Sequence, residues 1–266
     1  MFRLGDFAFD RITVGLAKNF ESEILYTLHQ LADATIDVTG ESKEVKDKDG
    51  NLIRKIWITK AGTFSANNAM PNVNILNASS GTELQYGDVK AISDMPSIKI
   101  VKASETEVVL DADVIEGTIS VAPAYANGAS GTAYKMGTAG KDTFSYDEST
   151  NKVTLPTLAE VDDKDKPKNF IIAYKRASES GLKVANYADK FPKTIELVLK
   201  ALYIDPCLKD GVRPAYIVLP SFQPSPETNL SIKTDSQLEY KGDLQLDYCG
   251  EEKALYYIYF PDEVEQ

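Results

Sequence analysis

The stretch that most constrains the fold is Arg213–Tyr248, which predicts three consecutive β-strands. These strands are Ala215–Leu219, Thr228–Thr234 and Gln237–Tyr248. From Leu238 onward the last strand alternates apolar and polar residues, the pattern of one buried face and one face in water. The prolines of Pro220–Pro226 cannot donate ladder hydrogen bonds, so we expect an extended crossing between the first two strands. A long amphipathic ribbon with no reactive group at its end indicates an assembly surface.

The N-terminal region also predicts strands. Ser22–Leu31 fits a helical face or a strand, and its β-rich surroundings favour the strand. Ala34–Thr39 alternates and is a predicted strand. Glu41–Lys60 predicts a long hairpin with its tip at Lys46–Asn51, because Asp-Gly and Gly-Asn dipeptides tolerate the positive φ angles of tight turns.

Residues 93–166 have a different character, with short predicted strands separated by glycine-rich turns. The strands are Ile98–Val101, Glu107–Leu110, Thr118–Val121, Thr143–Tyr146 and Lys152–Leu155. Such spacing is typical of a small β-sandwich or an elaborated hairpin lobe. We therefore predict a mainly β protein with at most one or two short helices. Residues 1–92 and 167–266 form a discontinuous core, and residues 93–166 form an inserted lobe.

Three further strands complete the predicted core. Phe170–Lys175 is expected to resume the core sheet after the lobe. In Lys193–Asp205 both alternating faces carry apolar residues, so we expect this strand to be buried in part on both sides. Leu255–Phe260 is expected to close the fold.

The charge of the chain is unevenly distributed. The net charge is −11. Glu227–Gln266 carries ten acids and three lysines, a net of −7, whereas residues 167–226 carry nine bases and five acids, a net of +4. An acidic end beside a basic stretch suits head-to-tail contacts between copies of one chain. It argues against nucleic-acid binding, which needs clustered lysine and arginine.

No pattern of catalytic or metal-binding residues stands out. His29 is the one histidine and lies in an apolar run, and Cys207 and Cys249 stand apart from any other ligand type. We interpret the cysteines as buried thiols of a protein made in a reducing cytoplasm. A single disulfide between them is the alternative. Asp47–Asn51 resembles the start of a calcium loop, but Ile58 occupies the position of the bidentate glutamate. We expect no enzyme, cofactor, signal peptide or membrane-spanning helix.

Several segments resemble tail tube (major tail) proteins of tailed bacteriophages. They are GESKEVKDKDGNLIRKIWITKAGTFSANNAM (40–70), ADKFPKTIELVLKALYIDPC (188–207), AYIVLPSFQPSPETNLSIKTDSQLEYKGDLQLDYCG (215–250) and ALYYIYFP (254–261). The resemblance covers residues 1–92 and 167–266. It implies a tail-tube-like β-sandwich or barrel that is made in the bacterial cytoplasm, assembles as stacked hexameric rings in the virion tail, and passes DNA without binding it specifically. It suggests the sheath, tape measure and tail terminator proteins as further partners, and no membrane.

This resemblance gives two sets of candidate residues. The candidates for the tube lumen are Asp235, Glu239, Asp243 and Asp247. All four have odd numbers, so in an unbroken strand they share one face. The candidates for contacts between rings, at the hairpin, are Lys46, Asp47, Lys48, Asp49 and Arg54.

Three other functions remain open at this point. The first is another virion β-protein, either a capsid decoration or a baseplate-associated component. The second is a β-sandwich adhesin or carbohydrate-binding module, although Trp57 is the one tryptophan and sugar sites favour exposed aromatic residues. The third is an enzyme that depends on His29.

Overall fold

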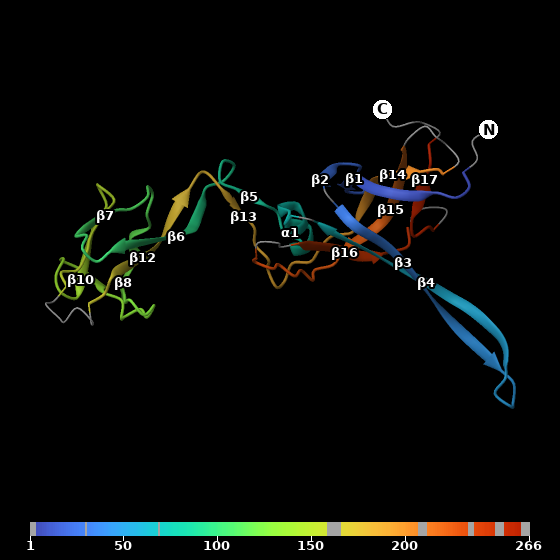
Figure 1. The fold of residues 1–266 in the computed structure, drawn as a ribbon, viewed down its shortest axis with the longest axis horizontal. Coiled ribbons are helices and arrows are strands. Elements are labelled where there is room, and N and C mark those ends of the chain that lie inside the picture. The colour runs from blue at the N-terminus through green and yellow to red at the C-terminus, as the bar shows by residue number, and fades with distance from the viewer. Residues whose placement is uncertain are drawn as a thin grey trace. The chain divides into compact units, whose positions relative to one another are not determined.

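The computed structural model of the chain describes residues 4–29, 31–68, 70–158, 166–206, 212–233, 237–247 and 253–261 (Figure 1). The protein is mainly β, as predicted, and it divides into two compact units. The larger unit comprises Met1–Glu83 with Val184–Gln266, and the smaller comprises Leu84–Lys183. The predicted division into a discontinuous core (1–92 and 167–266) and an inserted lobe (93–166) stays a prediction. No helix in the described part of the chain has the length and apolarity needed to cross a membrane.

The larger unit is built on one antiparallel sheet. Its strands are β1 (Ala8–Lys18), β2 (Ile24–Leu28), β3 (Leu31–Lys46), β4 (Leu52–Asn68), β14 (Ile195–Ile204), β15 (Arg213–Pro224), β16 (Leu238–Leu244) and β17 (Tyr257–Tyr259). The order is β2-β1-β14-β15-β16-β4-β3, and β17 also pairs with β15. The path of described strands does not close on itself, so these strands form an open sheet and no closed barrel.

The core of this unit lies where the predicted alternation placed it. In β14, Leu197, Leu199 and Ala201 are buried, and Leu202 on the opposite face is buried as well, which confirms the expectation of burial on both sides. Aromatic rings of β4, β15 and β16 pack beside them, with Phe64 and Phe222 at 5.8 Å between centroids. Edge-to-face packing of this kind adds to the area that the rings bury.

One short helix accompanies the sheet. Helix α1 (Val73–Ser80) begins where the side chain of Asn72 accepts a hydrogen bond from the Asn74 N–H, and it ends at Gly81. Gly81 has a φ of 63°, a conformation that glycine adopts without steric cost. The alternative predicted for Ser22–Leu31 is settled in favour of a strand, which is β2.

Two predictions in Arg213–Tyr248 are wrong. Strand β15 continues through Pro220 to Pro224 instead of leaving the sheet for a crossing. Leu219 pairs with Leu197 and Phe222 with Ile195, so Pro220 and Ser221 form a bulge, where a missing N–H breaks no ladder bond. The predicted strand Thr228–Thr234 is irregular over its described residues 228–233. The two edges of β15 are occupied by β14 on one side and by β17 and β16 on the other. No edge of β15 is therefore left for residues 228–233 to pair with.

The smaller unit contains two principal sheets around one core. One sheet comprises β6 (Ile92–Lys102), β12 (Asn169–Ser178) and β8 (Ser120–Ala124). The other comprises β7 (Glu107–Val109), β11 (Lys152–Thr154), β10 (Thr143–Asp147) and β9 (Lys135–Met136). Phe144 and Val153 from one sheet and Phe170 and Ile172 from the other are buried in a shared cluster. This arrangement is a small sandwich, with β5 (Gln85–Tyr86), β13 (Leu182–Lys183) and the 3-10 helix η1 (Glu116–Thr118) beside it.

The strand predicted at Phe170–Lys175 is present as β12, but its placement was wrong. It pairs with β6 and β8 in the smaller unit and not with the core sheet. Its residues Phe170 and Ile172 fill the core of the sandwich, so the lobe needs this strand for its own burial. The position of this strand in the sequence does not reveal that it pairs with β6 and β8.

Candidate functional site

A polar face of the core sheet holds the first group of candidate residues. In β16 the side chains of Glu239 and Asp243 are exposed, while Leu238, Tyr240 and Leu244 are buried on the other face. The two carboxylates therefore share one face, as the alternation predicted. The pairing of β16 with β4 places Glu239 opposite Asn67 and Asp243 opposite Thr63.

The same face continues onto β3, where sequence reasoning missed an acidic residue. Thr63 of β4 pairs with Asp37 of β3, and Ser65 pairs with Thr35. The Thr35 and Ser65 hydroxyls lie 2.8 Å apart, which shows that these side chains point the same way. Asp37 is exposed and lies on the same face as Asp243, with β4 between them. The alternation of residues 34–39 predicts that Asp37 lies on one face of a strand. Only the pairing of β3 with β4, and of β4 with β16, shows that this is the face of Asp243.

Lys241 interrupts the acidic face. Its Nζ lies 3.3 Å from Glu227 and 3.7 Å from a Glu239 oxygen. The hydrogen bond to Glu227, followed by the attraction of Glu239, raises the pKa of Lys241. The lysine neutralises part of the negative charge near one end of β16, and Asp243 and Asp37 lie farther along the sheet.

The alternation of β16 does not extend to Asp247. Asp235 lies outside the described residues. Strand β16 ends at Leu244, and the Gln245 N–H then donates to the Ser221 carbonyl. Leu246 is 50% exposed, so the alternation predicted as far as Tyr248 breaks before Asp247. Strand alternation therefore does not assign Asp247 to the face of Glu239 and Asp243.

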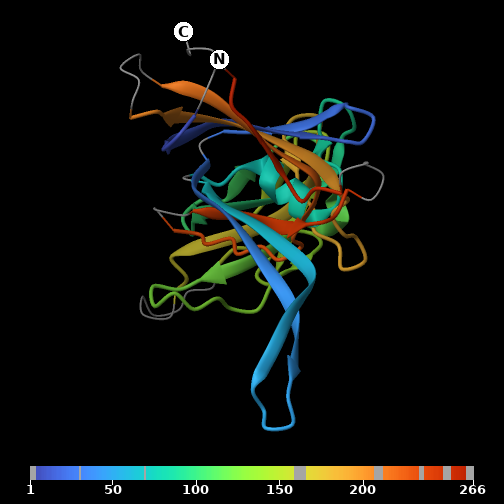
Figure 2. The same ribbon diagram turned by 90° about the vertical axis from the view of Figure 1, so that its right-hand side faces the viewer.

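The hairpin of β3 and β4 projects away from the remaining strands of its unit (Figure 2). Its predicted turn is confirmed. One carboxylate oxygen of Asp47 accepts hydrogen bonds from the N–H groups of Asp49 and Asn51, at 2.9 and 2.7 Å. Gly50 has a φ of 85°. Hydrogen bonds from the Asn51 side chain first, and then from its backbone, lower the pKa of Asp47, so this carboxylate holds the turn together.

The projecting part of the hairpin is both apolar and basic. Its exposed apolar side chains are Val45, Leu52, Ile53, Ile56, Trp57 and Ile58. Every residue of β4 from Leu52 to Lys60 is exposed, on both faces of the ribbon. Residues 43–60 carry six bases, among them Lys46, Lys48 and Arg54, and three acids, a net of +3. Exposed apolar side chains at this density indicate a surface that a partner covers.

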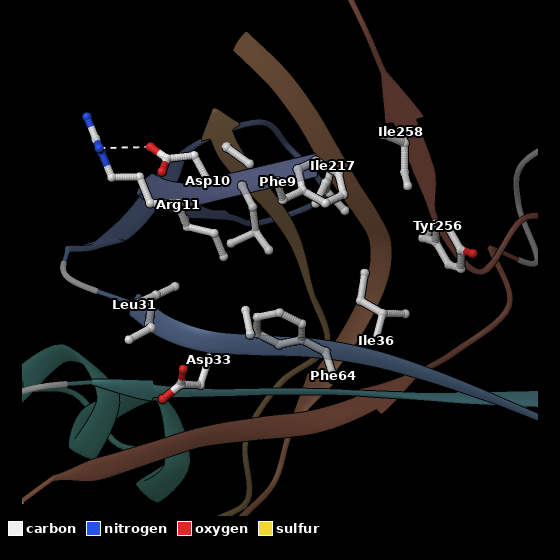
Figure 3. Close-up of a pocket in the computed structure, with 15 residues that line it drawn as sticks. Phe9, Asp10, Arg11, Leu31, Asp33, Ile36, Phe64, Ile217, Tyr256 and Ile258 are labelled. Carbon is white, nitrogen blue, oxygen red and sulfur yellow. Dashed lines mark hydrogen bonds and ion pairs between the residues drawn. The ribbon is translucent and has the colours of Figure 1, made fainter. Parts of the chain in front are cut away.

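A cavity of about 670 Å³ opens in the larger unit between β1 and β3 (Figure 3). Its walls are mostly apolar and include Leu31, Ile36, Phe64, Leu199, Ile217 and Ile258. The charged groups in its lining are Asp33 and the ion pair of Asp10 and Arg11, whose atoms lie 2.8 Å apart. Among the described residues that line the cavity, none is a nucleophile paired with a base.

The remaining candidates from the sequence do not assemble into a site. His29 is exposed and does not line the cavity. Cys207 and Cys249 lie outside the described residues. Within the ranges that the structure describes, no group of three or more His, Cys, Asp or Glu side chains is arranged to hold a metal ion.

Comparison with known proteins places the chain in a family. No curated protein matches it. A model of the YomU/Tube protein family, a family of phage-derived tube-like proteins, matches residues 10–255. The match spans both units and nearly all of the chain, and it agrees at the family level with the resemblance to tube proteins. The chain therefore belongs to the YomU/Tube protein family.

Proposed function

We propose that this chain is a structural subunit that polymerises as stacked hexameric rings into a phage tail tube, the conduit for DNA delivery. The observation that carries the proposal is the projecting hairpin of β3 and β4 with apolar side chains on both faces. Membership of a tube protein family supports it.

The hairpin supports contacts between rings. A two-stranded ribbon that packs on nothing is at best marginally stable in water. Here Ile53 is 66% exposed and Trp57 is 63% exposed, with the Lys55 amine over the indole ring at 4.7 Å. These side chains gain burial if the ribbon docks on a subunit of the neighbouring ring. In this arrangement Lys46, Lys48, Asp49 and Arg54 surround the apolar contact, and Asp47 shapes the turn.

Unpaired strand edges support contacts within a ring. Within the described part of the chain, β3 pairs only with β4, so its other edge presents free backbone groups along Leu31–Lys46. On the β2 side of β1, pairing begins at Gly15, which leaves residues 8–14 open. Strands of a neighbouring subunit complete such edges, and copies related by rotation then form a closed ring. Because the cavity is lined by β1 and β3, the same contact also covers its apolar walls.

The acidic sheet face supports a lumen through which DNA slides. Glu239, Asp243 and Asp37 present three carboxylates on a face that also carries Thr63, Ser65 and one lysine, Lys241. A negative wall repels phosphates and disfavours sticking, and this arrangement lacks the clustered lysine and arginine of a DNA-binding surface. Asp235 and Asp247 remain predicted members of the lumen.

The proposal extends to location and partners. The subunit is a virion component of the tail and acts without catalysis or a cofactor. Its main partner is a second copy of itself, and the tail sheath, tape measure and tail terminator proteins are proposed at the outside, inside and end of the tube.

Negative-stain electron microscopy of the purified chain at rising concentration tests this function. We expect hollow tubes of stacked six-fold rings. Adding pre-formed tube fragments as seeds removes the need for an initiator. Closed trimers or single rings that never stack in the presence of seeds would instead favour a capsid decoration or a baseplate-associated protein.

A further inference from the structure

The smaller unit has an exposed apolar edge that the proposed function does not use. In the described part of the chain, strand β6 (Ile92–Lys102) pairs with β12 and with no other strand. Ile98 is 70% exposed and Ile100 is 66% exposed. Their partners on β12, Ala173 and Ile171, point to the same outer face, opposite the buried Phe170 and Ile172. An apolar face therefore runs up to an open strand edge.

The direction of the backbone groups along this edge follows from neighbouring hydrogen bonds. Lys175 pairs with Pro96 in the ladder, but its N–H donates to the Thr118 hydroxyl and its carbonyl accepts from the Ile115 N–H, on the far side from β6. Pro96 and Lys175 are thus a non-hydrogen-bonded pair, and the Pro96 carbonyl points to the open edge. Ile98 and Ile100, with the same parity, point their N–H and C=O groups there too.

We propose that β6 is a strand-addition surface that takes β6 of a second copy, antiparallel, with Ile98 opposite Ile98. In this register Lys102 of each copy lies opposite Asp94 of the other, and Ile100 lies opposite Pro96. The result is one continuous sheet of two smaller units with a shared apolar outer face.

Charge complementarity selects this occupant and this register. Lys102 is exposed on the same face as Ile98, and Asp94 is exposed at the bulge where Ser93 and Asp94 together lie opposite Ala177 of β12. Sliding the second strand by two residues places Lys102 opposite Pro96 or Ile92 and removes both ion pairs. Asp94 already accepts hydrogen bonds from Lys183, at 2.8 and 2.7 Å. In the dimer its carboxylate therefore lies between two lysines, Lys183 of the same copy and Lys102 of the other. Pro96 donates no hydrogen bond, which makes the contact reversible and weaker than the interior of a sheet.

The contact is two-fold, and this distinguishes it from the proposed tube interfaces. A two-fold axis cannot repeat between rings that stack in one direction. The β6 contact therefore joins free subunits, or subunits of two separate tubes, and its test does not depend on tube formation.

Disulfide trapping in the full chain tests the register. The background carries Cys207→Ser and Cys249→Ser, and Ile98→Cys and Ile100→Cys are compared after mild oxidation on non-reducing gels. Opposed residues of a hydrogen-bonded pair have Cα atoms about 5.5 Å apart, inside the disulfide range of ~4.4–6.8 Å. Two copies of residue 100 are offset by four residues, about 13 Å, and cannot be bridged.

We expect a covalent dimer from Ile98→Cys and none from Ile100→Cys, a matched control on the same strand with similar exposure. No dimer from Ile98→Cys, or equal dimer from both variants, overturns the proposal. Sedimentation gives a second measurement. Lys102→Asp or Asp94→Lys alone is expected to weaken dimerisation about tenfold, because each change acts on two symmetric pairs, and the double swap is expected to restore it. Absence of rescue by the double swap contradicts the register.

Discussion

The buried hydroxyl pair of Tyr26 and Tyr240 provides a quantitative prediction for the core. Their oxygens lie 2.9 Å apart, with Tyr240 fully buried and Tyr26 half-buried. In Tyr26→Phe the Tyr240 hydroxyl loses its partner in the interior, which costs about 1–3 kcal/mol of unfolding free energy. The double change Tyr26→Phe with Tyr240→Phe removes both polar groups and leaves the ring packing in place. We expect the double variant to lose less stability than the sum of the two single losses, by roughly 1 kcal/mol or more.

The assay is guanidinium unfolding of the dilute subunit, followed by far-ultraviolet circular dichroism. Trp57 is a poor reporter because it lies on the exposed hairpin. Single losses that simply add would refute the hydroxyl pair, since a double-mutant cycle isolates the interaction.

The same pair predicts a loss of stability in alkali. Burial, partly opposed by the hydrogen bond to Tyr240, raises the pKa of Tyr26 to about 12. Burial also raises the pKa of Tyr240 well above its ordinary value. The unfolded chain loses these protons near pH 10, so the folded state is fully favoured below pH 10 and loses stability as the pH rises toward 12. The Tyr26 contribution approaches about 2–3 kcal/mol. Tyr26→Phe should flatten this decline, and an unchanged alkaline profile would contradict the burial of the pair.

Other predictions concern the core, the hairpin and the acidic face. The Tyr203 hydroxyl is buried without a hydrogen-bond partner among the described residues, so Tyr203→Phe is expected to leave stability unchanged or raise it by up to about 1 kcal/mol, measured by thermal unfolding. In Gly242→Ala the new Cβ clashes with the Gln223 backbone carbonyl and lies 2.6 Å from the Phe222 ring, and we expect a loss of about 1–3 kcal/mol in the same assay. Deleting Lys46–Asn51 should abolish tubes in electron micrographs while the circular dichroism spectrum stays that of a folded subunit. Glu239→Lys should leave tube assembly intact but slow DNA ejection from virions, since a positive wall attracts phosphates; normal ejection would count against a lumen position.

Much of the fold was predictable from local patterns. The alternation along β16 and β14 correctly gave their buried faces, and the Asp-Gly turn near Gly50 correctly gave the tip of the hairpin. These features depend on neighbouring residues along the chain. The course of β15 through Pro220 was not predictable in this way, because a bulge opposite Glu196 makes room for the proline, and that bulge is a property of the pairing with β14.

The candidate site was predictable in part, for the same reason. Glu239 and Asp243 were found because they lie on one strand with a strict alternation. Asp37 joins them through two successive pairings across β4, and no spacing in the sequence encodes that neighbourhood. The apolar character of the hairpin was visible in the sequence, but its exposure on both faces depends on the absence of a packing layer there.

Cryo-electron microscopy of assembled tubes tests the central claim most directly. We expect a helical stack of six-fold rings, with the hairpin of β3 and β4 contacting a subunit of the next ring and the carboxylates of Glu239, Asp243 and Asp37 facing the lumen. A map with these carboxylates on the outer wall, or with the hairpin exposed to solvent in the assembled tube, would contradict it.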